Sequence, residues 1–241
     1  MVIIDGRAIA QKRLEILKSK IKDLKKTPKL AIVLVGENPA SKLYVSMKIK
    51  KAREVGIETE VVDDISKVSA DATGIIVQLP CINSKEIIEK IPIEKDVDGL
   101  KKGSRFLPAT VRGILEMLKQ VQHDTYGTCV IVGRSEIVGK PLAMEMINRG
   151  ATVIVCNSKT KNLEDFTKQA DILISATGHP NLITKEMVKP GAIVIDVGSP
   201  KGDVDFENVK EVAGAITPVP GGVGPMTIIS LLENVLEAAK I

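Results

Sequence analysis

Tyr44 and Lys48 lie four positions apart within residues 39–55, a stretch whose pattern predicts a helix. Residues four apart share one face of a helix, so the phenol and the amine could contact one ligand. A lysine amine in a partly desolvated cleft has a lowered pKa and can act as acid or base near neutral pH. The same spacing also fits a solvent-facing lysine beside a half-buried tyrosine, so the pair alone leaves both interpretations open.

Gln78 and Asp98 are two further candidates. Gln78 ends the aliphatic stretch 74–78, and open α/β sheets place ligands at the carboxyl ends of their strands. Asp96 and Asp98 precede Gly99 and are too few to bind a metal ion. Asp98 could instead accept paired hydrogen bonds from an amino-substituted heterocycle. A strand terminus and a simple turn are the alternatives for these two positions.

A glycine turn containing Gly133, Arg134, Ser135 and Gly139 stands between an apolar strand and a helix. Glycine lets the backbone approach phosphate oxygens, and the N-terminus of the helix offers free N–H groups to an anion. The spacing departs from the usual G-x-G-x-x-G, so an ordinary strand-to-helix turn also fits these residues. Because strands and helices continue to alternate after the turn, we favour a dinucleotide site.

Ser158 lies just after the next predicted strand, at the position that selects the dinucleotide. NAD enzymes usually place a carboxylate there for the ribose hydroxyls, but residues 156–160 contain none. A hydroxyl with the Lys159 cation, and Arg134 across the turn, suits a 2′-phosphate. We therefore expect NADP as the cofactor, with NAD less favoured.

A Pro/Gly-rich stretch over residues 217–227 has little propensity for helix or strand. Its glycines permit positive φ or a close approach of the backbone to a ligand. Prolines on both flanks favour a stiff surface over a flexible linker, and a purely structural loop is the alternative.

The elements that must position these residues predict an α/β fold of two domains. Residues 1–120 with a returning helix, 226–241, would form an N-terminal three-layer lobe with a parallel sheet, and residues 121–225 a Rossmann-type dinucleotide-binding lobe, joined at the loop 123–127. The last helix should return because its apolar stripe needs a partner. The stripe consists of Ile228, Leu231, Leu232, Val235 and Ala239. The predicted strands are 30–35, 58–62, 74–78, 128–132, 152–155, 172–175 and 192–197, and the helices before the last are 5–25, 39–55, 84–91, 114–121, 140–149, 162–169 and 184–188.

Composition excludes several classes of protein. The chain is 44% hydrophobic with only 2% aromatic residues, which favours an aliphatic core around parallel strands. The net charge of +4 comes from basic residues interspersed along helices, so we expect no nucleic-acid partner. No apolar run is long enough to span a bilayer, so we expect no membrane partner. Three cysteines without metal-type spacing and only two histidines argue against a metal centre and favour free thiols in the cytoplasm.

Together these segments resemble the methylenetetrahydrofolate dehydrogenase/cyclohydrolase family. The shared motifs occur in family order over essentially the whole chain. They are Tyr44-Val45-x-x-Lys48 with Gly56-Ile57, Gly74-Ile75-Ile76-Val77-Gln78-Leu79-Pro80, Lys95-Asp96-Val97-Asp98-Gly99, Val132-Gly133-Arg134-Ser135-x-Ile137-Val138-Gly139-Lys140-Pro141, Ile195-Asp196-Val197-Gly198 and, most specific of all, residues 217–227.

The resemblance implies an enzyme of one-carbon metabolism that acts on a folate. Hydride would pass from the methylene bridge of tetrahydrofolate to NADP, and water would open the resulting methenyl cation to formyltetrahydrofolate. Lys48 would be the acid/base group of the hydrolytic step, assisted by Gln78, with Tyr44 stacking on the folate. Asp98 would hold the pterin ring. The wall of the folate cleft would come from Gly221, Gly222 and Pro225.

The resemblance also implies how the cofactor binds. The phosphates would be held by Gly133, Arg134, Ser135 and Ser158, and Ser199 would lie beside the nicotinamide end. Members of the family are homodimers, so we expect a second copy of this chain as a partner.

The chain departs from the family pattern at three places. Residues 108–111 are Pro-Ala-Thr-Val where the family usually has Pro-Cys-Thr-Pro, so Ala109 and Val111 differ. Cys81-Ile82 stands where Leu-Pro commonly follows Gln-Leu-Pro, and Asn157 replaces a histidine at the strand end. The first two places border the folate cleft, and the third bears on cofactor choice.

Two rival functions remain open from the residues. A two-domain dehydrogenase acting on a small amino or hydroxy acid would not need the pair Tyr44 and Lys48 beside Asp98. A non-catalytic dinucleotide-binding regulator would need neither Lys48 nor Gln78.

Overall fold

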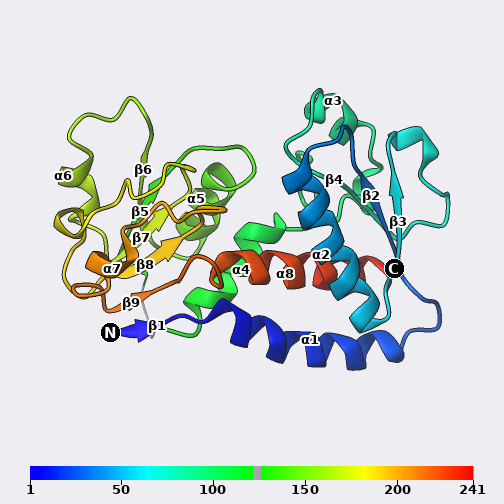
Figure 1. The fold of residues 1–241 in the computed structure, drawn as a ribbon, viewed down its shortest axis with the longest axis horizontal. Coiled ribbons are helices and arrows are strands. Elements are labelled where there is room, and N and C mark those ends of the chain that lie inside the picture. Colours follow the sequence, from blue (N-terminus) through cyan, green and yellow to red (C-terminus); the bar gives the residue numbers. More distant parts are fainter. Residues whose placement is uncertain (122–125, 241) are drawn as a thin grey trace. The chain divides into compact units, whose positions relative to one another are not determined.

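The computed structural model describes residues 1–121 and 126–240, so residues 123–125 of the predicted linker lie outside the described residues. The described residues form two compact units, each with its own parallel sheet (Figure 1). Unit 1 contains Met1–Ala10 and Thr110–Thr227, and unit 2 contains Gln11–Ala109 and the residues from Ile228 on.

Unit 2 is built on a three-stranded sheet in the order β3-β2-β4. Strand β2 pairs with both neighbours, Leu30 lying opposite Thr59 on β3 and Gly74 on β4. Buried side chains of β2 and β4 form a core with Ala72 and Ile91. The bounds are β2 (Lys29–Val33), α2 (Pro39–Val55), β3 (Glu58–Val62), β4 (Gly74–Val77) and α3 (Ser84–Glu89), with α1 (Gly6–Lys22) and α8 (Val223–Ala238) each contributing the part that belongs to the unit.

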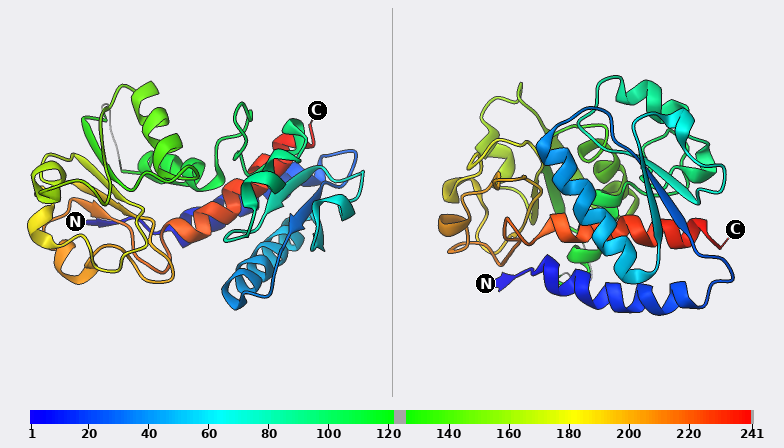
Figure 2. Two further views of the ribbon diagram at one scale, coloured as in Figure 1. Left: turned by 90° about the horizontal axis from the view of Figure 1, so that it is seen from above. Right: turned by 45° about the vertical axis from the view of Figure 1, so that its right-hand side comes forward.

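Helix α8 is buried on more than the predicted stripe, because Ile229, Ser230 and Leu236 are buried as well as Ile228, Leu231, Leu232 and Val235. A helix that is apolar nearly all round belongs inside a domain. Within unit 2 it lies beside α1 (red and blue in Figure 2), where Arg13 Nε donates a hydrogen bond to Glu233 Oε1 over 2.8 Å. The residues from Ile228 on are therefore an integral part of unit 2.

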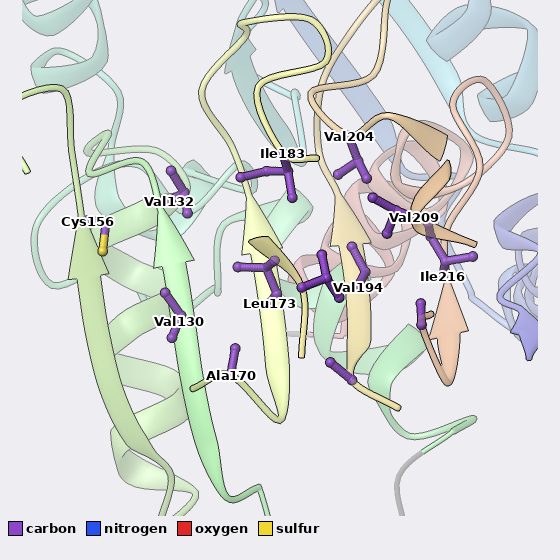
Figure 3. Packing of buried hydrophobic residues seen from close by; sticks show 13 residues of the cluster. Val130, Val132, Cys156, Ala170, Leu173, Ile183, Val194, Val204, Val209 and Ile216 are labelled. Atoms are coloured by element: carbon purple, nitrogen blue, oxygen red, sulfur yellow. The ribbon is translucent and has the colours of Figure 1, made fainter. Parts of the chain in front are cut away.

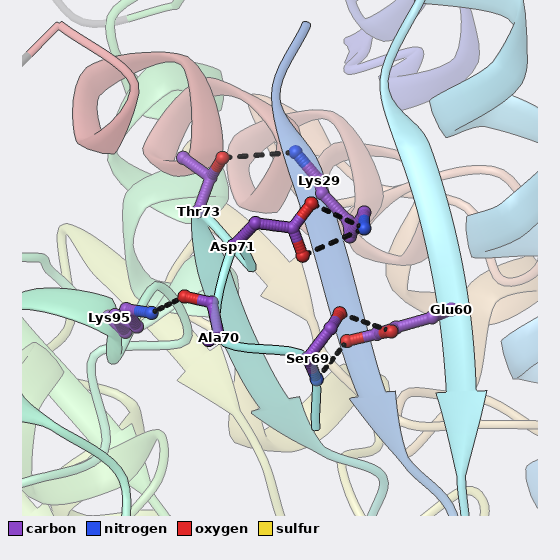
Figure 4. A network of polar contacts seen from close by, with 7 residues as sticks. All are labelled: Lys29, Glu60, Ser69, Ala70, Asp71, Thr73 and Lys95. Atoms are coloured by element: carbon purple, nitrogen blue, oxygen red, sulfur yellow. Dashed lines mark hydrogen bonds and ion pairs between the residues drawn. The ribbon is translucent and has the colours of Figure 1, made fainter. Parts of the chain in front are cut away.

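A polar network closes the amino end of the unit 2 sheet (Figure 4). Lys29 Nζ, at the start of β2, contacts both carboxylate oxygens of Asp71, and the Lys29 N–H donates to Thr73 Oγ1 over 3.0 Å. Ser69 donates through its N–H and its hydroxyl to Glu60 of β3. These bonds hold the short connection between β3 and β4, which contains only the 3₁₀ turn Ile65–Lys67. The network lies at the opposite end of β4 from Gln78.

Unit 1 is built on a six-stranded sheet in the order β1-β9-β8-β7-β5-β6. Alternate residues of neighbouring strands, among them Val130, Leu173 and Val194, form one buried cluster on a face of the sheet (Figure 3). Each such burial contributes roughly 1.5–3 kcal/mol. The bounds are β1 (Val2–Ile3), α4 (Ala109–Leu118), β5 (Thr128–Val132), α5 (Gly139–Asn148), β6 (Thr152–Cys156), α6 (Leu163–Thr167), β7 (Ile172–Ser175), β8 (Ile193–Asp196), α7 (Phe206–Val209) and β9 (Ala215–Ile216).

The sequence patterns missed some elements of unit 1. Strands β1 and β9 are two residues each and pair with one another, with Val2 opposite Ala215. Two residues are too few to show the alternation of apolar and polar side chains that would predict a strand. The predicted helix 184–188 is only the 3₁₀ turn Lys185–Met187, and α4 begins five residues before the predicted 114–121.

The two units also divide the chain at other places than the domains expected from the sequence. Residues 1–10 and 110–120 group with the dinucleotide-type sheet instead of with the first lobe, and the last helix changes unit at Ile228 instead of at residue 226. The pairing of β1 with β9 explains the first difference.

Candidate active site

Lys48 and Gln78, thirty residues apart in the sequence, are joined by a hydrogen bond from Lys48 Nζ to Gln78 Oε1 over 3.0 Å. Gln78 is 6% exposed, and its Nε2 donates to the Leu79 carbonyl over 2.7 Å. The carbonyl therefore fixes the amide so that its oxygen faces the amine. The structure thus brings together two residues that the sequence indicated only separately.

Helix α2 places Lys48 because both of its ends are fixed locally. Asn38 caps the first turn, its side-chain oxygen accepting a hydrogen bond from Ser41 N over 3.1 Å, and Pro39 occupies the first helical position. Gly56 ends the helix in the left-handed conformation at φ 88°. Gln78 directly follows β4, whose residues are all buried.

Burial shifts the pKa values of two charged groups at this site, the Lys48 amine and the Asp98 carboxyl. Burial lowers the pKa of Lys48 below the ordinary lysine value, and the Asp98 carboxylate opposes that shift. Burial likewise raises the pKa of Asp98; the Lys48 charge opposes this shift, and Asp96 adds to it. Lys48 can therefore release its proton more readily than a surface lysine.

The segment that carries Asp98 is held by its backbone. Asn234 of α8 donates from Nδ2 to the Val97 carbonyl over 2.9 Å and to the Leu107 carbonyl over 3.1 Å. Gly99 turns the chain at φ 69°, where a Cβ would come within 2.5 Å of the Phe106 carbonyl oxygen. Sequence reasoning missed Asn234, because only the return of α8 brings it to this segment.

Tyr44 lies one turn before Lys48 on α2 and is 36% exposed, whereas Lys48 is half-buried. This is the reverse of the solvent-facing lysine and half-buried tyrosine that the spacing also allowed. The Tyr44 ring is therefore accessible for contact with a ligand.

In unit 1, Gly133 forms the turn after β5 in a conformation that needs glycine. Its φ is 123°, and a Cβ would lie 2.4 Å from the Ala176 carbonyl oxygen. Gly139 is packed as tightly, since its Cβ would lie 2.1 Å from the Gly133 carbonyl oxygen. Ser135 Oγ accepts from the N–H groups of Val138 and Gly139, at the start of α5. The result is a narrow turn leading into a helix N-terminus, the form that suits a phosphate.

Arg134 and Ser158 follow neighbouring strands, because β5 and β6 are paired with Val132 opposite Cys156. Gly133 N donates to the Cys156 carbonyl over 2.9 Å, which keeps the two strand ends together. Both side chains are exposed, and the Arg134 guanidinium has no ion pair within the described residues. An unpaired cation and a hydroxyl at adjacent strand ends fit a 2′-phosphate.

The stretch 217–227 is a packed loop that runs directly into α8, which begins at Val223. Gly221 has φ 117°, and a Cβ on Gly6 would come within 1.9 Å of the Gly222 carbonyl oxygen. Arg7 N donates to the Gly221 carbonyl over 3.0 Å. The start of α1 therefore fixes this loop, and Pro225 lies in the first turn of α8. Ser199 is exposed in the loop after β8.

Residues 4–98 match the catalytic-domain model of the tetrahydrofolate dehydrogenase/cyclohydrolase family, and residues 108–241 match its NAD(P)-binding domain. The chain belongs to this family. Both the family and the predicted two-domain α/β fold class are thereby confirmed, and the enzyme is of the one-carbon folate type.

Relatives of the family match over nearly their full length. A protein named bifunctional protein FolD from Exiguobacterium sibiricum is 47% identical, with 99% of each chain covered. The crystal structure of bifunctional FolD from Campylobacter jejuni is 42% identical with a TM-score of 0.94, covering 100% of this chain and 99% of that one. The FolD of Trypanosoma brucei, solved in complex with NADP and an inhibitor, is 31% identical with a TM-score of 0.92, covering 100% and 97%.

The described residues contain neither a cluster suited to a metal ion nor a membrane-spanning helix. Within residues 1–121 and 126–240, no three His, Cys, Asp or Glu side chains lie so that they could hold a metal ion. No described helix has the length and apolar character to cross a membrane.

Proposed function

We propose that this chain oxidises methylenetetrahydrofolate to methenyltetrahydrofolate with NADP and then hydrolyses the product to formyltetrahydrofolate. The observation that carries the proposal is the Lys48–Gln78 hydrogen bond beside Asp98 in a member of this family. Neither a small-acid dehydrogenase nor a non-catalytic regulator requires a dehydrated lysine held in this way.

Unit 2 would bind the folate and carry out the hydrolytic step. Lys48 would transfer protons as water attacks and the ring opens, and Gln78 would orient the amine through its amide oxygen. Asp98 would accept hydrogen bonds from the amino-substituted pterin, and Tyr44 would stack on its ring. The family resemblance supports Gly221, Gly222 and Pro225 as further residues for folate binding.

Unit 1 would bind the dinucleotide, which supplies the hydride acceptor when bound. The turn at Gly133 packs against the Ala176 carbonyl and leads into the N-terminus of α5, where N–H groups would meet phosphate. Arg134 and Ser158 would contact the 2′-phosphate, and Ser199 would lie toward the nicotinamide end. The T. brucei relative solved with NADP supports this cofactor.

The most direct test is a spectrophotometric assay of methenyltetrahydrofolate formation with NADP and with NAD. We expect methenyltetrahydrofolate to form when methylenetetrahydrofolate and a dinucleotide are both present. The kcat/KM should be higher with NADP than with NAD. A chain that binds NADP and shows no turnover would instead support the regulator.

Replacing Arg134 with alanine should separate the two dinucleotides. Loss of a charge-assisted contact to phosphate costs about 1.5–3 kcal/mol, so NADP should bind roughly tenfold or more weakly, while NAD changes little. Titration calorimetry with each dinucleotide measures this. Arg149→Ala, just after the opposite end of α5, is the matched control and should alter neither affinity. Equal losses for NADP and NAD would show that Arg134 contacts a group common to both.

The hydrolytic rate should depend on pH through Lys48. As a base the amine acts in its neutral form, so the rate should rise with pH through the Lys48 pKa. Burial lowers that pKa, so the midpoint should fall below the ~10.4 of a free lysine. Initial rates on methenyltetrahydrofolate, corrected for uncatalysed hydrolysis, measure the profile. A midpoint at or above that of free lysine would contradict this role.

We further propose that the chain forms a homodimer and acts in the cytoplasm, without nucleic-acid or membrane partners. The family resemblance supports the dimer, and the free thiols of Cys81, Cys129 and Cys156 support a reducing compartment. Light scattering of the purified protein tests the dimer, for which a monomeric mass would be the contrary result.

A further inference from the structure

Two buried carboxylates that have no part in the proposed chemistry lie at the carboxyl end of the unit 1 sheet. Asp196 ends β8 at 2% exposure, and Asp203 lies seven residues later at 0%. Neither has an ion pair within the described part of the chain. Burying a carboxylate without a cation is costly, so hydrogen bonds must stabilise each of the two.

Asp196 closes the loop that follows its own strand. Its Oδ1 accepts from Gly198 N over 2.8 Å and from Asp203 N over 3.0 Å, and its Oδ2 accepts from Val204 N over 3.0 Å. Burial raises the pKa of Asp196, and these backbone N–H groups oppose the rise. Both ends of the loop are thus tied to one side chain, and Ser199 lies between them.

Asp203 joins this loop to the loop after the neighbouring strand, β7. Its Oδ2 accepts from Thr177 N over 2.6 Å and from Ser175 Oγ over 3.0 Å. Its Oδ1 is buried without a hydrogen-bond donor from the described residues. The side chain of Asp203 is therefore bonded to the carboxyl end of β7 and the loop after it through Oδ2 alone.

Two glycines make room for the two carboxylates in a reciprocal way. A Cβ on Gly198 would lie 2.8 Å from Asp203 Oδ1, and a Cβ on Gly202 would lie 2.4 Å from Asp196 Oδ2. Asp203 therefore packs against Gly198, which is near Asp196 in the sequence. Asp196 in turn packs against Gly202, which directly precedes Asp203. The loop is therefore tightly packed around both carboxylates.

These contacts reach the phosphate turn. The sheet order changes direction between β5 and β7, and ligands of such sheets bind outside the strand ends at that point. The Ala176 carbonyl, next to Thr177, packs against Gly133 there. Asp203 thus holds in register the loops after β7 and β8, of which the first touches the turn after β5.

We propose that Asp203 is a positioning residue for the dehydrogenase half of the reaction. It sets the Thr177 backbone and the Ser199 loop where the nicotinamide end of the cofactor binds, while the phosphates are held by the β5 turn. This inference rests on the proposed function. If Asp203 served only the stability of unit 1, its replacement would lower the melting temperature and leave both activities of the folded protein unchanged.

The test compares Asp203→Ala and Asp203→Asn with the parent. For each we would measure dehydrogenase kcat, NADP affinity by calorimetry, the melting temperature, and hydrolysis of preformed methenyltetrahydrofolate without dinucleotide. Asp203→Ala should lower dehydrogenase kcat about 10²-fold through misplacement of the reacting groups, with NADP affinity and hydrolysis changed less than about threefold. Asp203→Asn keeps an oxygen that can accept from Thr177 N and should recover most of the rate.

Asp171→Ala is the matched control. Asp171 also accepts from a backbone N–H, that of Thr128 over 2.8 Å, but at the amino end of the same sheet. It should lower the melting temperature and leave both activities unchanged. Should Asp203→Ala not fold, Gly198→Ala retains the carboxylate and displaces it, and should lower dehydrogenase kcat on the order of tenfold with hydrolysis intact.

Parental dehydrogenase kcat in the folded variant, or dehydrogenase and hydrolysis falling in parallel, would overturn the positioning role. Failure of the proposed function is distinct, because the parent chain itself would then form no methenyltetrahydrofolate.

Discussion

Lys48→Met should abolish hydrolysis of methenyltetrahydrofolate while the dehydrogenase activity falls much less. Methionine keeps most of the bulk of the side chain and removes the amine that contacts Gln78. Loss of a general acid/base costs ~10²–10⁴-fold in rate. Hydride transfer needs mainly alignment of the methylene carbon with the cofactor, so methenyltetrahydrofolate should accumulate. Absorbance of the methenyl product, followed with NADP and methylenetetrahydrofolate, shows both effects in one trace.

Lys50→Met is the matched control for this prediction, because Lys50 is an exposed lysine on the same helix. It should change neither activity. NADP affinity should be the same in both variants, since neither residue belongs to unit 1. A Lys48→Met protein that hydrolyses methenyltetrahydrofolate at the parental rate would refute the assignment of Lys48.

Gly133→Ala should have the opposite selectivity, with hydrolysis retained and dehydrogenase activity reduced on the order of 10²-fold. The new methyl group would lie 2.4 Å from the Ala176 carbonyl oxygen, and the φ of 123° is unfavourable for alanine. The turn must therefore move, and the backbone N–H groups that would meet the phosphates move with it. NADP titration and the two activity assays measure the result.

Gly150→Ala separates the steric effect from the cost of the backbone conformation. Gly150 also has a positive φ, 83°, but a Cβ there meets nothing within 4 Å. This variant should lose about 1 kcal/mol or more of stability and keep both activities. Similar NADP binding by Gly133→Ala and the parent would show that the turn does not hold phosphate.

The sequence predicted best where local chemistry fixes an element. The bounds of α2 follow from Asn38, Pro39 and Gly56, and the predicted helix 39–55 is the one observed. Strand 128–132 was likewise predicted to the residue, because it is a short aliphatic run between turn signals. Lys48 and Gln78 could each be named from their local setting, but a contact across thirty residues has no local signal.

Features that depend on distant residues were missed for the same reason. Strand β9 exists through its pairing with β8 and β1, and only two residues take part. Helix α8 begins inside a stretch rich in proline and glycine, because Gly224 and Pro225 are tolerated in a first turn. Asp203 follows no strand directly, so only the fold reveals that it reaches Thr177.

The return of α8 to unit 2 has a consequence for how the chain can be made. A ribosome produces residues 11–109 long before residues 228–240, yet both belong to the same unit, and Asn234 completes hydrogen bonds to Val97 and Leu107. Residues 11–109 therefore keep an uncovered apolar surface during translation until the end of α8 is made. In that time residues 110–227, about half of the chain and all but ten residues of unit 1, are translated. Neither unit is one continuous segment of the chain. Thr110 and Thr227, the residues just outside the two segments of unit 2, are hydrogen-bonded through their hydroxyls over 3.2 Å, so a fusion of residue 109 to residue 228 would put unit 2 on one continuous chain.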